Sequence, residues 1–244
     1  MCDACRFKNL HWKGWNEVPE PAMAGGGSAW IDLSHRLTED LSAIPNYPKP
    51  SFSRWRRIPD YPANITHMSM VVHHGTHLDA PNHFIDDAPS FDQVPLSRLY
   101  GPGVVWSFDV AEYGLIDVPD LEKATPEARP GDIVLFDTGW SLRIEDPSYV
   151  RHASLTPAAA EWLLAKNVKM IGVDFATPDR APDNRPEGFY WPVHHILLPH
   201  GILIAEHVNN PGALSNRRIE AVFAGLSIAG ADGAPVRALA RAVD

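Results

Sequence analysis

The pattern of apolar and polar positions along the 244-residue chain predicts strands that alternate with helices. Short apolar runs, of the length expected for buried strands, recur from residue 29 onward. They cover 29–33, 104–110, 131–137, 170–175, 201–205 and 219–228, the last of which is broken by Gly225. Met68, Met70 and Val72 also alternate with their neighbours and predict a strand that leads to residue 73. The alternation of predicted strands with predicted helices along the chain indicates an α/β fold.

Two segments between these strands have the start signals of helices. Thr156 is suited to the N-cap and Pro157 to the first helical position. Apolar residues then recur at helical spacing up to Val168, and the strand at 170–175 follows directly. A shorter helix is predicted at Asp117–Asp120, where Asp and Pro fit a first turn.

A glycine-rich stretch predicts the division of the chain into an arm and one domain. Residues 1–28 form the arm, which carries Trp12 and Trp15 and ends in a flexible link at 24–28. Residues 29–244 have the length of a single domain. We expect the arm to dock on a neighbouring subunit, because tryptophan buries a large area with few rotatable bonds. A free tail and a lid over the chain's own pocket are the alternatives.

Composition and charge narrow the class of protein. Hydrophobic content of 45% and charged content of 21% are ordinary for a globular protein. A net charge of −9 argues against nucleic-acid and anionic-membrane partners. Without a membrane-spanning apolar stretch or a signal region, we expect a cytoplasmic protein. The basic stretch 54–57 is expected at a pocket mouth or a subunit contact. Cys2 and Cys5 form a C-x-x-C pair without a second pair, and we expect them to lie in a weakly tethered tip.

The most informative segment carries four histidines and a carboxylate within residues 73–83. Imidazole nitrogens and carboxylate oxygens are the ligands that bind Zn²⁺, Mn²⁺ or Fe²⁺. This segment therefore predicts a metal site in a loop and points to metal-assisted hydrolysis. His73, His77 and Asp79 are the candidate ligands, and spacing alone leaves His83 as either a ligand or a proton carrier.

The spacing of these ligands predicts a bend in the chain. In extended form the four steps from His73 to His77 would span about 13 Å, at roughly 3.3 Å per residue, which is long for two imidazoles on one ion. Gly75 permits a bend at small cost, and Pro81 bars a regular helix. We therefore favour a bent loop over a helical pair of ligands.

Residues 73–83 match the whole of the signature HxGTHxDxPxH. In this the chain resembles the cyclase family of metal-dependent hydrolases, which includes bacterial kynurenine formamidases and isatin hydrolases. The resemblance covers about residues 28 to 235. It implies a single domain of the swivelling α/β type, with a mixed, barrel-like β-sheet flanked by helices. It also implies that His73, His77 and Asp79 bind Zn²⁺ or Mn²⁺, that His83 is the acid/base residue, and that the protein forms a homodimer or homotetramer.

A second, looser signature of the family lies downstream. His194 is followed by Leu197 and Leu198 and, twelve residues on, by Glu206. The resemblance implies that His194 and Glu206 hold a second ion bridged by Asp79 to the first, so that the site takes one or two ions. The alternative is that these histidines surround a buried turn and that Glu206 ends a surface strand.

The substrate is less defined by the sequence than the chemistry is. The proline-rich segment 175–193 resembles neither a formamidase loop nor an isatin hydrolase loop. His207 follows Glu206 where formamidases of the family often carry a smaller amide residue. We expect a planar or aromatic small molecule contacted by Trp55, Phe84, Tyr190, Trp191 and His207.

These observations predict hydrolysis of an amide-type C–N bond, such as that of a formamide, a lactam or a cyclic imide. The ion would lower the pKa of a water toward neutrality, and His83 would take its proton and return it to the leaving nitrogen. A lyase or cyclase acting through an enolate, a lactone hydrolase and a non-catalytic metal carrier are the alternatives.

Overall fold

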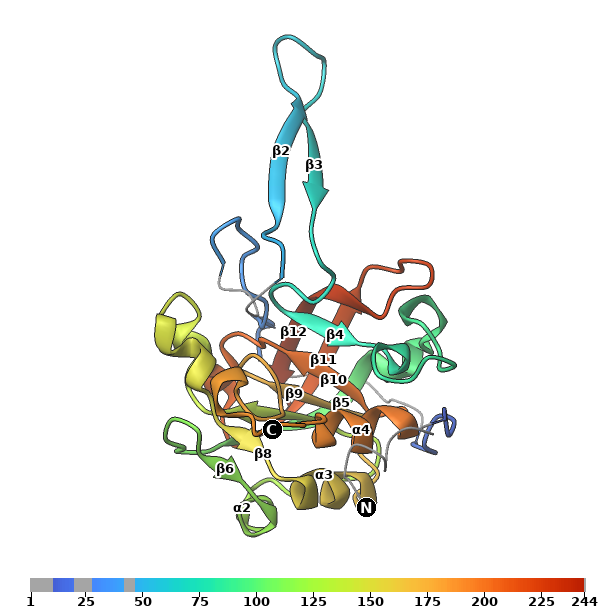
Figure 1. Ribbon diagram of the computed structural model, residues 1–244, viewed down its shortest axis with the longest axis vertical. Helices are drawn as coiled ribbons and strands as arrows, with labels where there is room; N and C mark the ends of the chain where they lie inside the picture. The colour runs from blue at the N-terminus through green and yellow to red at the C-terminus, as the bar shows by residue number, and fades with distance from the viewer. Residues whose placement is uncertain (1–10, 20–27, 42–46, 244) are drawn as a thin grey trace.

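The computed structural model describes residues 11–19, 28–41 and 47–243. Cys2, Cys5 and most of the glycine-rich link lie outside these residues. Seven strands close into a barrel in the order β12-β11-β5-β7-β9-β10-β4, with β4 paired back to β12 and β1 added beside β12 (Figure 1). Their bounds are β1 Ile31–Asp32, β4 His77–Asp79, β5 Tyr100–Ser107, β7 Ile133–Asp137, β9 Met170–Val173, β10 Leu203–Glu206, β11 Arg217–Gly225 and β12 Gly233–Ala242. The prediction of a mixed, barrel-like sheet is confirmed.

The barrel combines parallel and antiparallel pairs. Strands β5, β7, β9 and β10 are parallel neighbours, and the other pairs are antiparallel. The helices are α2 Val118–Lys123, α3 Pro157–Ala165 and α4 Pro192–Leu197. Because parallel strands need crossover connections, α3 lies between β7 and β9 in the chain and α4 between β9 and β10. Thr156 caps α3 as predicted, and its hydroxyl accepts a hydrogen bond from the Ala159 backbone N–H at 3.1 Å.

Side chains on the barrel strands alternate between two apolar layers. On β5, Val105 packs in a cluster to which all seven barrel strands contribute, and this cluster fills the barrel interior. Val104, its neighbour, packs in the outer cluster with α3 and α4. The same alternation divides Leu135 from Phe136 on β7. Both faces of these strands are therefore buried, which explains why their sequences are continuous apolar runs.

A two-stranded hairpin projects from the barrel. It consists of β2 Ser51–Arg56 and β3 Ile65–Ser69 and rises clear of the remaining strands (Figure 1). The strand predicted to lead to residue 73 therefore ends earlier, and its alternation belongs to an exposed ribbon. Trp55 and Ile58 on this hairpin are 66% and 59% exposed.

The described part of the N-terminal arm lies along its own chain. The backbone N–H groups of Lys13 and Asn16 donate to the carbonyls of Pro199 and His200. Trp15 packs under the Arg98 guanidinium. Docking of the arm on a neighbouring subunit stays a prediction. No helix within the described residues has the length and apolarity needed to cross a membrane.

Candidate metal centre

Two paired strands carry metal-donor side chains on the face opposite the barrel interior. In β4, His77 and Asp79 share this face because they are two residues apart, while Leu78 packs inside the barrel. Glu206 of β10 lies directly opposite His77 in the antiparallel pair. This register brings Glu206 Oε2 to 3.5 Å from His77 Nε2.

The bend predicted at Gly75 is present and brings His73 to the same face. Gly75 has a φ of +66°, and a Cβ there would lie 2.5 Å from Leu37 Cδ2. Gly233 makes room for the His73 ring, since a Cβ at this position would lie 2.8 Å from His73 Cε1. The rings of His73 and His77 consequently have their centroids 5.0 Å apart.

Two of the predicted ligands have one ring nitrogen held by a hydrogen bond and the other turned toward carboxylates. His77 Nδ1 donates to the Gly75 carbonyl at 2.8 Å, and His194 Nδ1 donates to Asp179 at 2.6 Å. Each bond selects the tautomer in which Nε2 carries a lone pair for a metal. Nε2 of His194 lies 3.3 Å from Glu206 Oε1.

Asp79 lies between His73 and His77 on one side and His194 on the other. Its Oδ1 is 2.9 Å from His73 Nδ1 and 3.3 Å from His77 Nε2, and its Oδ2 is 3.4 Å from His194 Nε2. Asp79 Oδ2, His77 Nε2 and Glu206 Oε1 are buried and make no hydrogen bond to a described residue. Buried polar atoms without partners are costly, and imidazole nitrogens with carboxylate oxygens suit a divalent cation. The residues present therefore fit a metal ion.

Histidines and carboxylates of the cluster hold one another ionised. Burial lowers the pKa of His73, but hydrogen bonds to Asp232 and Asp79 outweigh it and raise this pKa to about 10. Burial lowers the pKa of His194, but the adjacent carboxylates of Asp179, Asp79 and Glu206 outweigh it and raise this pKa well above its usual range. The pKa of Asp79 lies well below its usual range despite burial, because the His83 charge and the adjacent rings of His194, His73 and His77 favour the ionised carboxylate. A metal ion would supply the same positive charge by displacing these protons.

His83 stands at the rim of the cluster. It ends the 3₁₀ helix η1 Pro81–His83, and its side chain is 22% exposed against 4% for His73. His83 Nδ1 donates to Asp232 Oδ2 at 3.2 Å, and the same oxygen accepts from His73 Nε2 at 2.8 Å. This leaves His83 Nε2 as the proton-accepting atom. Its side chain also lies close enough to His73 and Asp79 for a shared ion, so the two roles suggested by spacing both have a geometric basis.

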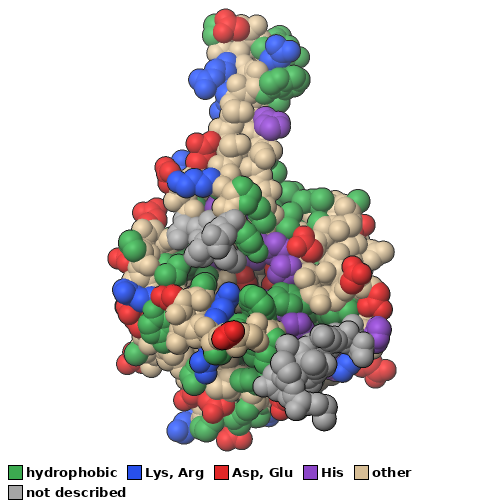
Figure 2. Space-filling view, in the orientation of Figure 1, with side chains coloured by type: hydrophobic (Ala, Val, Ile, Leu, Met, Phe, Trp, Pro, Cys, Tyr) green, Lys and Arg blue, Asp and Glu red, His purple; other side chains and the backbone are tan. Residues whose placement is uncertain are grey.

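A cavity of about 320 Å³ adjoins the donors. Histidine side chains gather on this face of the molecule, below the hairpin (Figure 2). Phe84 stacks on the His194 ring with centroids 4.5 Å apart, and Trp191 lies 6.2 Å from Phe84. The lining residues are Tyr47, His83, Phe84, Thr177, Arg185, Trp191, His194 and Glu206.

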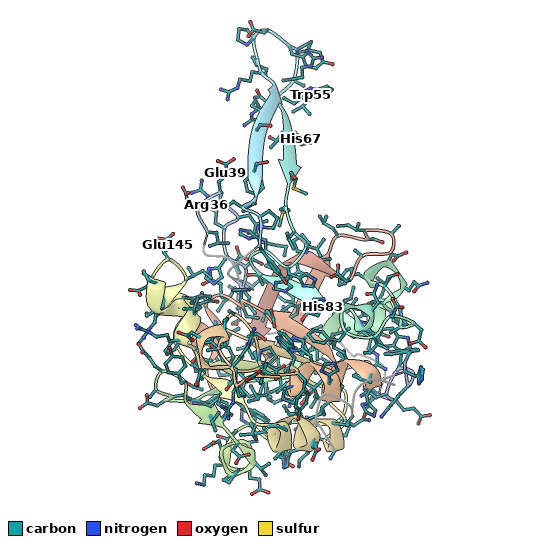
Figure 3. All side chains as sticks on the ribbon, viewed as in Figure 1. Arg36, Glu39, Trp55, His67, His83 and Glu145 are labelled. Carbon is teal, nitrogen blue, oxygen red and sulfur yellow. The ribbon has the colours of Figure 1, made fainter. Side chains whose placement is uncertain are left out.

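Three of the predicted substrate residues do not line this cavity. Trp55 lies on the hairpin, far from His83 (Figure 3), because the strand that carries it leaves the barrel. His207 is buried beside His77 and Glu206, with which it could share a metal ion, and its Nδ1 shares a hydrogen bond of 2.8 Å with the Tyr149 hydroxyl. Tyr190 packs beside His195. Contact of these three residues with the substrate therefore stays a prediction.

Several residues of the site have no signal in the local sequence. Asp232 lies in the turn that joins β11 to β12, and Asp179 in the proline-rich segment after β9. Tyr47, Thr177 and Arg185 reach the cavity from loops. The six residues predicted for metal binding and proton transfer, in contrast, come together in the structure: His73, His77, Asp79, His83, His194 and Glu206.

Comparisons with known proteins point to one family. Residues 31–180 match the family model Cyclase, described as "Putative cyclase". The kynurenine formamidase of Bacillus thuringiensis (strain Al Hakam) is 29% identical over 217 residues, which cover 88% of this chain and 99% of that protein.

Solved structures give the same picture. Isatin hydrolase A from Ralstonia solanacearum is similar with a TM-score of 0.80 and 26% identity, over 88% of this chain and 92% of that chain. A structure described as "The Structure Of Potential Metal-Dependent Hydrolase With Cyclase Activity" has a TM-score of 0.73 and 26% identity, over 88% of this chain and 98% of that one.

Proposed function

The chain belongs to the cyclase family, and from this premise we propose that it is a metal-dependent hydrolase of an amide-type C–N bond other than a peptide bond. The substrate is a formamide, lactam or cyclic imide of an aromatic or planar small molecule. One observation carries the proposal: buried imidazole and carboxylate atoms without hydrogen-bond partners converge beside a cavity with an aromatic wall. The similarity to a kynurenine formamidase and an isatin hydrolase supports this reaction class.

The residues divide into metal holders and proton carriers. His73, His77 and Asp79 would hold one ion, and Asp79 with His194 and Glu206 would hold a second. A bound divalent ion supplies Lewis acidity, which polarises the amide carbonyl and lowers the pKa of water. The mixed nitrogen and oxygen donors suit Zn²⁺ or Mn²⁺, which we propose as the ion.

The remaining steps use side chains of the cavity. His83 accepts a proton at Nε2 from the attacking water and returns it to the leaving nitrogen. Asp232 holds Nδ1 of His83 and so keeps the ring in one tautomer. Phe84 and Trp191 provide apolar faces for a planar substrate.

Labelled water tests the reaction class. The metal-loaded protein is incubated in ¹⁸O-water with isatin and with N-formylkynurenine, and the acid products are analysed by mass spectrometry. Hydrolysis predicts one ¹⁸O atom in the carboxylate of the ring-opened product or in formate. Turnover without incorporation of ¹⁸O would contradict the proposal and favour the lyase alternative through an enolate. Lactones are added to the same assay, and faster hydrolysis of a lactone than of either amide would favour the lactone hydrolase.

We also propose that the chain forms a homodimer or homotetramer through the β2–β3 hairpin. An isolated two-stranded hairpin is marginally stable in water, and this one exposes Trp55 and Ile58. The three arginines of its stretch 54–57 are complementary in charge to another copy, since the whole chain has a net charge of −9. Trp55 is then expected at the contact between copies.

Charged substitutions on the hairpin test this contact. Trp55→Glu combined with Ile58→Glu is expected to lower the mass in solution measured by light scattering, because two desolvated apolar side chains become charged. Leu142→Glu is the matched control, since Leu142 is 86% exposed on another part of the chain. An unchanged mass of the hairpin variant, with unchanged circular dichroism, would exclude the hairpin as the interface.

A further inference from the structure

Arg185 places a positive charge in the cavity beside the metal donors. Among the described residues that line the cavity, it is the only Lys or Arg side chain. It follows the 3₁₀ helix η6 Pro182–Asn184, in the segment that resembles neither a formamidase nor an isatin hydrolase loop. The catalytic scheme proposed above gives this arginine no role.

The Arg185 guanidinium is fixed on one side and open on the other. Its Nε donates to the Arg180 carbonyl at 2.8 Å, and its Cζ lies 5.1 Å from the Trp191 ring centroid and 5.5 Å from that of Phe189. Within the described residues, Nη1 and Nη2 make no hydrogen bond, and no carboxylate forms an ion pair with them. A guanidinium held in this way presents two parallel N–H donors, the geometry that matches a carboxylate.

The Arg185 guanidinium lies near several carboxylates of the metal centre, and this charge distribution bears on which substrates can enter the cavity. Asp79, Glu206 and Asp232 would repel an anion that enters the cavity, unless a metal ion and a further cation offset them. Trp191 lies beside Arg185 and both line the cavity, so a planar substrate that packs on Trp191 would lie close to the guanidinium. A neutral substrate would leave the Nη groups of Arg185 without a partner in a half-buried pocket.

We infer that Arg185 binds a carboxylate of the substrate and that the enzyme selects anionic aromatic amides over neutral ones. This inference rests on the proposed hydrolase function and specifies its substrate class. Arg185 sets specificity, and the proton transfers stay with His83. Loss of one charge-assisted hydrogen-bonded pair predicts a loss of about 10- to 100-fold in the preference for the anion.

Matched substrate pairs test the inference. The first comparison pairs N-formylaniline with each of its ortho-, meta- and para-carboxylates in turn. The second pairs isatin with a ring-carboxylated isatin. We expect a lower KM for a carboxylated member. Arg185→Gln should lower the ratio of kcat/KM between the carboxylated and the neutral member by about 10- to 100-fold, mainly through KM. Arg185→Lys should restore part of this ratio, since it keeps the charge but not the paired donors.

Arg180→Gln is the control variant, because it removes an exposed arginine of the same loop and keeps the backbone carbonyl that Arg185 uses. Its ratio should equal that of the wild type. Hydrolysis of the neutral members without a preference for the carboxylated ones would overturn the inference and leave the hydrolase proposal intact. An equal ratio in the wild type and Arg185→Gln would also overturn it. Hydrolysis of no member of either pair by metal-loaded protein would contradict the hydrolase proposal itself.

Discussion

Asp79→Ala is expected to lose bound metal and about 10³-fold or more in kcat together. The Asp79 carboxylate lies within 3.4 Å of nitrogens of His73, His77 and His194, so one substitution removes a donor from both groups. Metal ions contribute several kcal/mol to transition-state stabilisation, and each 1.36 kcal/mol corresponds to about tenfold in rate. The two losses are measured on one preparation of the variant, the metal content by elemental analysis and kcat by a steady-state assay.

Two further variants separate loss of metal from loss of fold. Asp79→Asn keeps the volume of the side chain and removes its charge, so it should show the same losses with unchanged circular dichroism. Glu145→Ala removes an exposed carboxylate distant from the cluster (Figure 3) and should keep both metal and activity. Full metal content in purified Asp79→Ala would show that the assigned ligand set is wrong.

For His83→Ala we expect the opposite combination, with metal retained and kcat lowered by about 10²-fold or more. His83 is the most exposed histidine of the cluster and is held through Asp232, which fits proton transfer at the rim of the cavity. His11→Ala, at an exposed histidine outside the site, serves as the control.

His83 has a competing role as a metal ligand, and the same measurements decide between the two. Loss of metal from His83→Ala would make His83 a ligand and leave the acid/base role without a residue. Retained metal together with an unchanged kcat would remove His83 from the mechanism.

The sequence pattern predicted several strands, one helix cap and one bend, because neighbouring residues in the chain determine these features. The apolar runs of β5 and β7 are buried on both faces, and Thr156 caps α3 as its sequence indicates. The bend at Gly75 followed from the distance that two imidazoles can share. The choice of His194 and Glu206 came from the resemblance to the second signature of the family, and the structure brings both side chains beside Asp79 or its neighbours.

Features that depend on pairing between distant segments were not predictable from local patterns. Asp232 meets His73 and His83 only because β12 pairs with β4, and nothing around residue 232 signals this contact. The alternation near Met68 indicates a strand correctly but does not tell that the strand leaves the barrel. Aromatic identity alone likewise could not separate Trp191, which lines the cavity, from Trp55, which does not.

The position of β4 between β10 and β12 has a consequence for the order in which the protein is made and folds. Asp79 is opposite Ile204 on one side and Gly233 on the other, so its neighbours are synthesised well over a hundred residues after it. Contacts of such high sequence separation form late, because closing the long intervening loops costs entropy first. While the chain emerges from the ribosome, His77 and Asp79 therefore lack both strand partners until β10 has been made, and they lack the β12 partner until that last strand is complete.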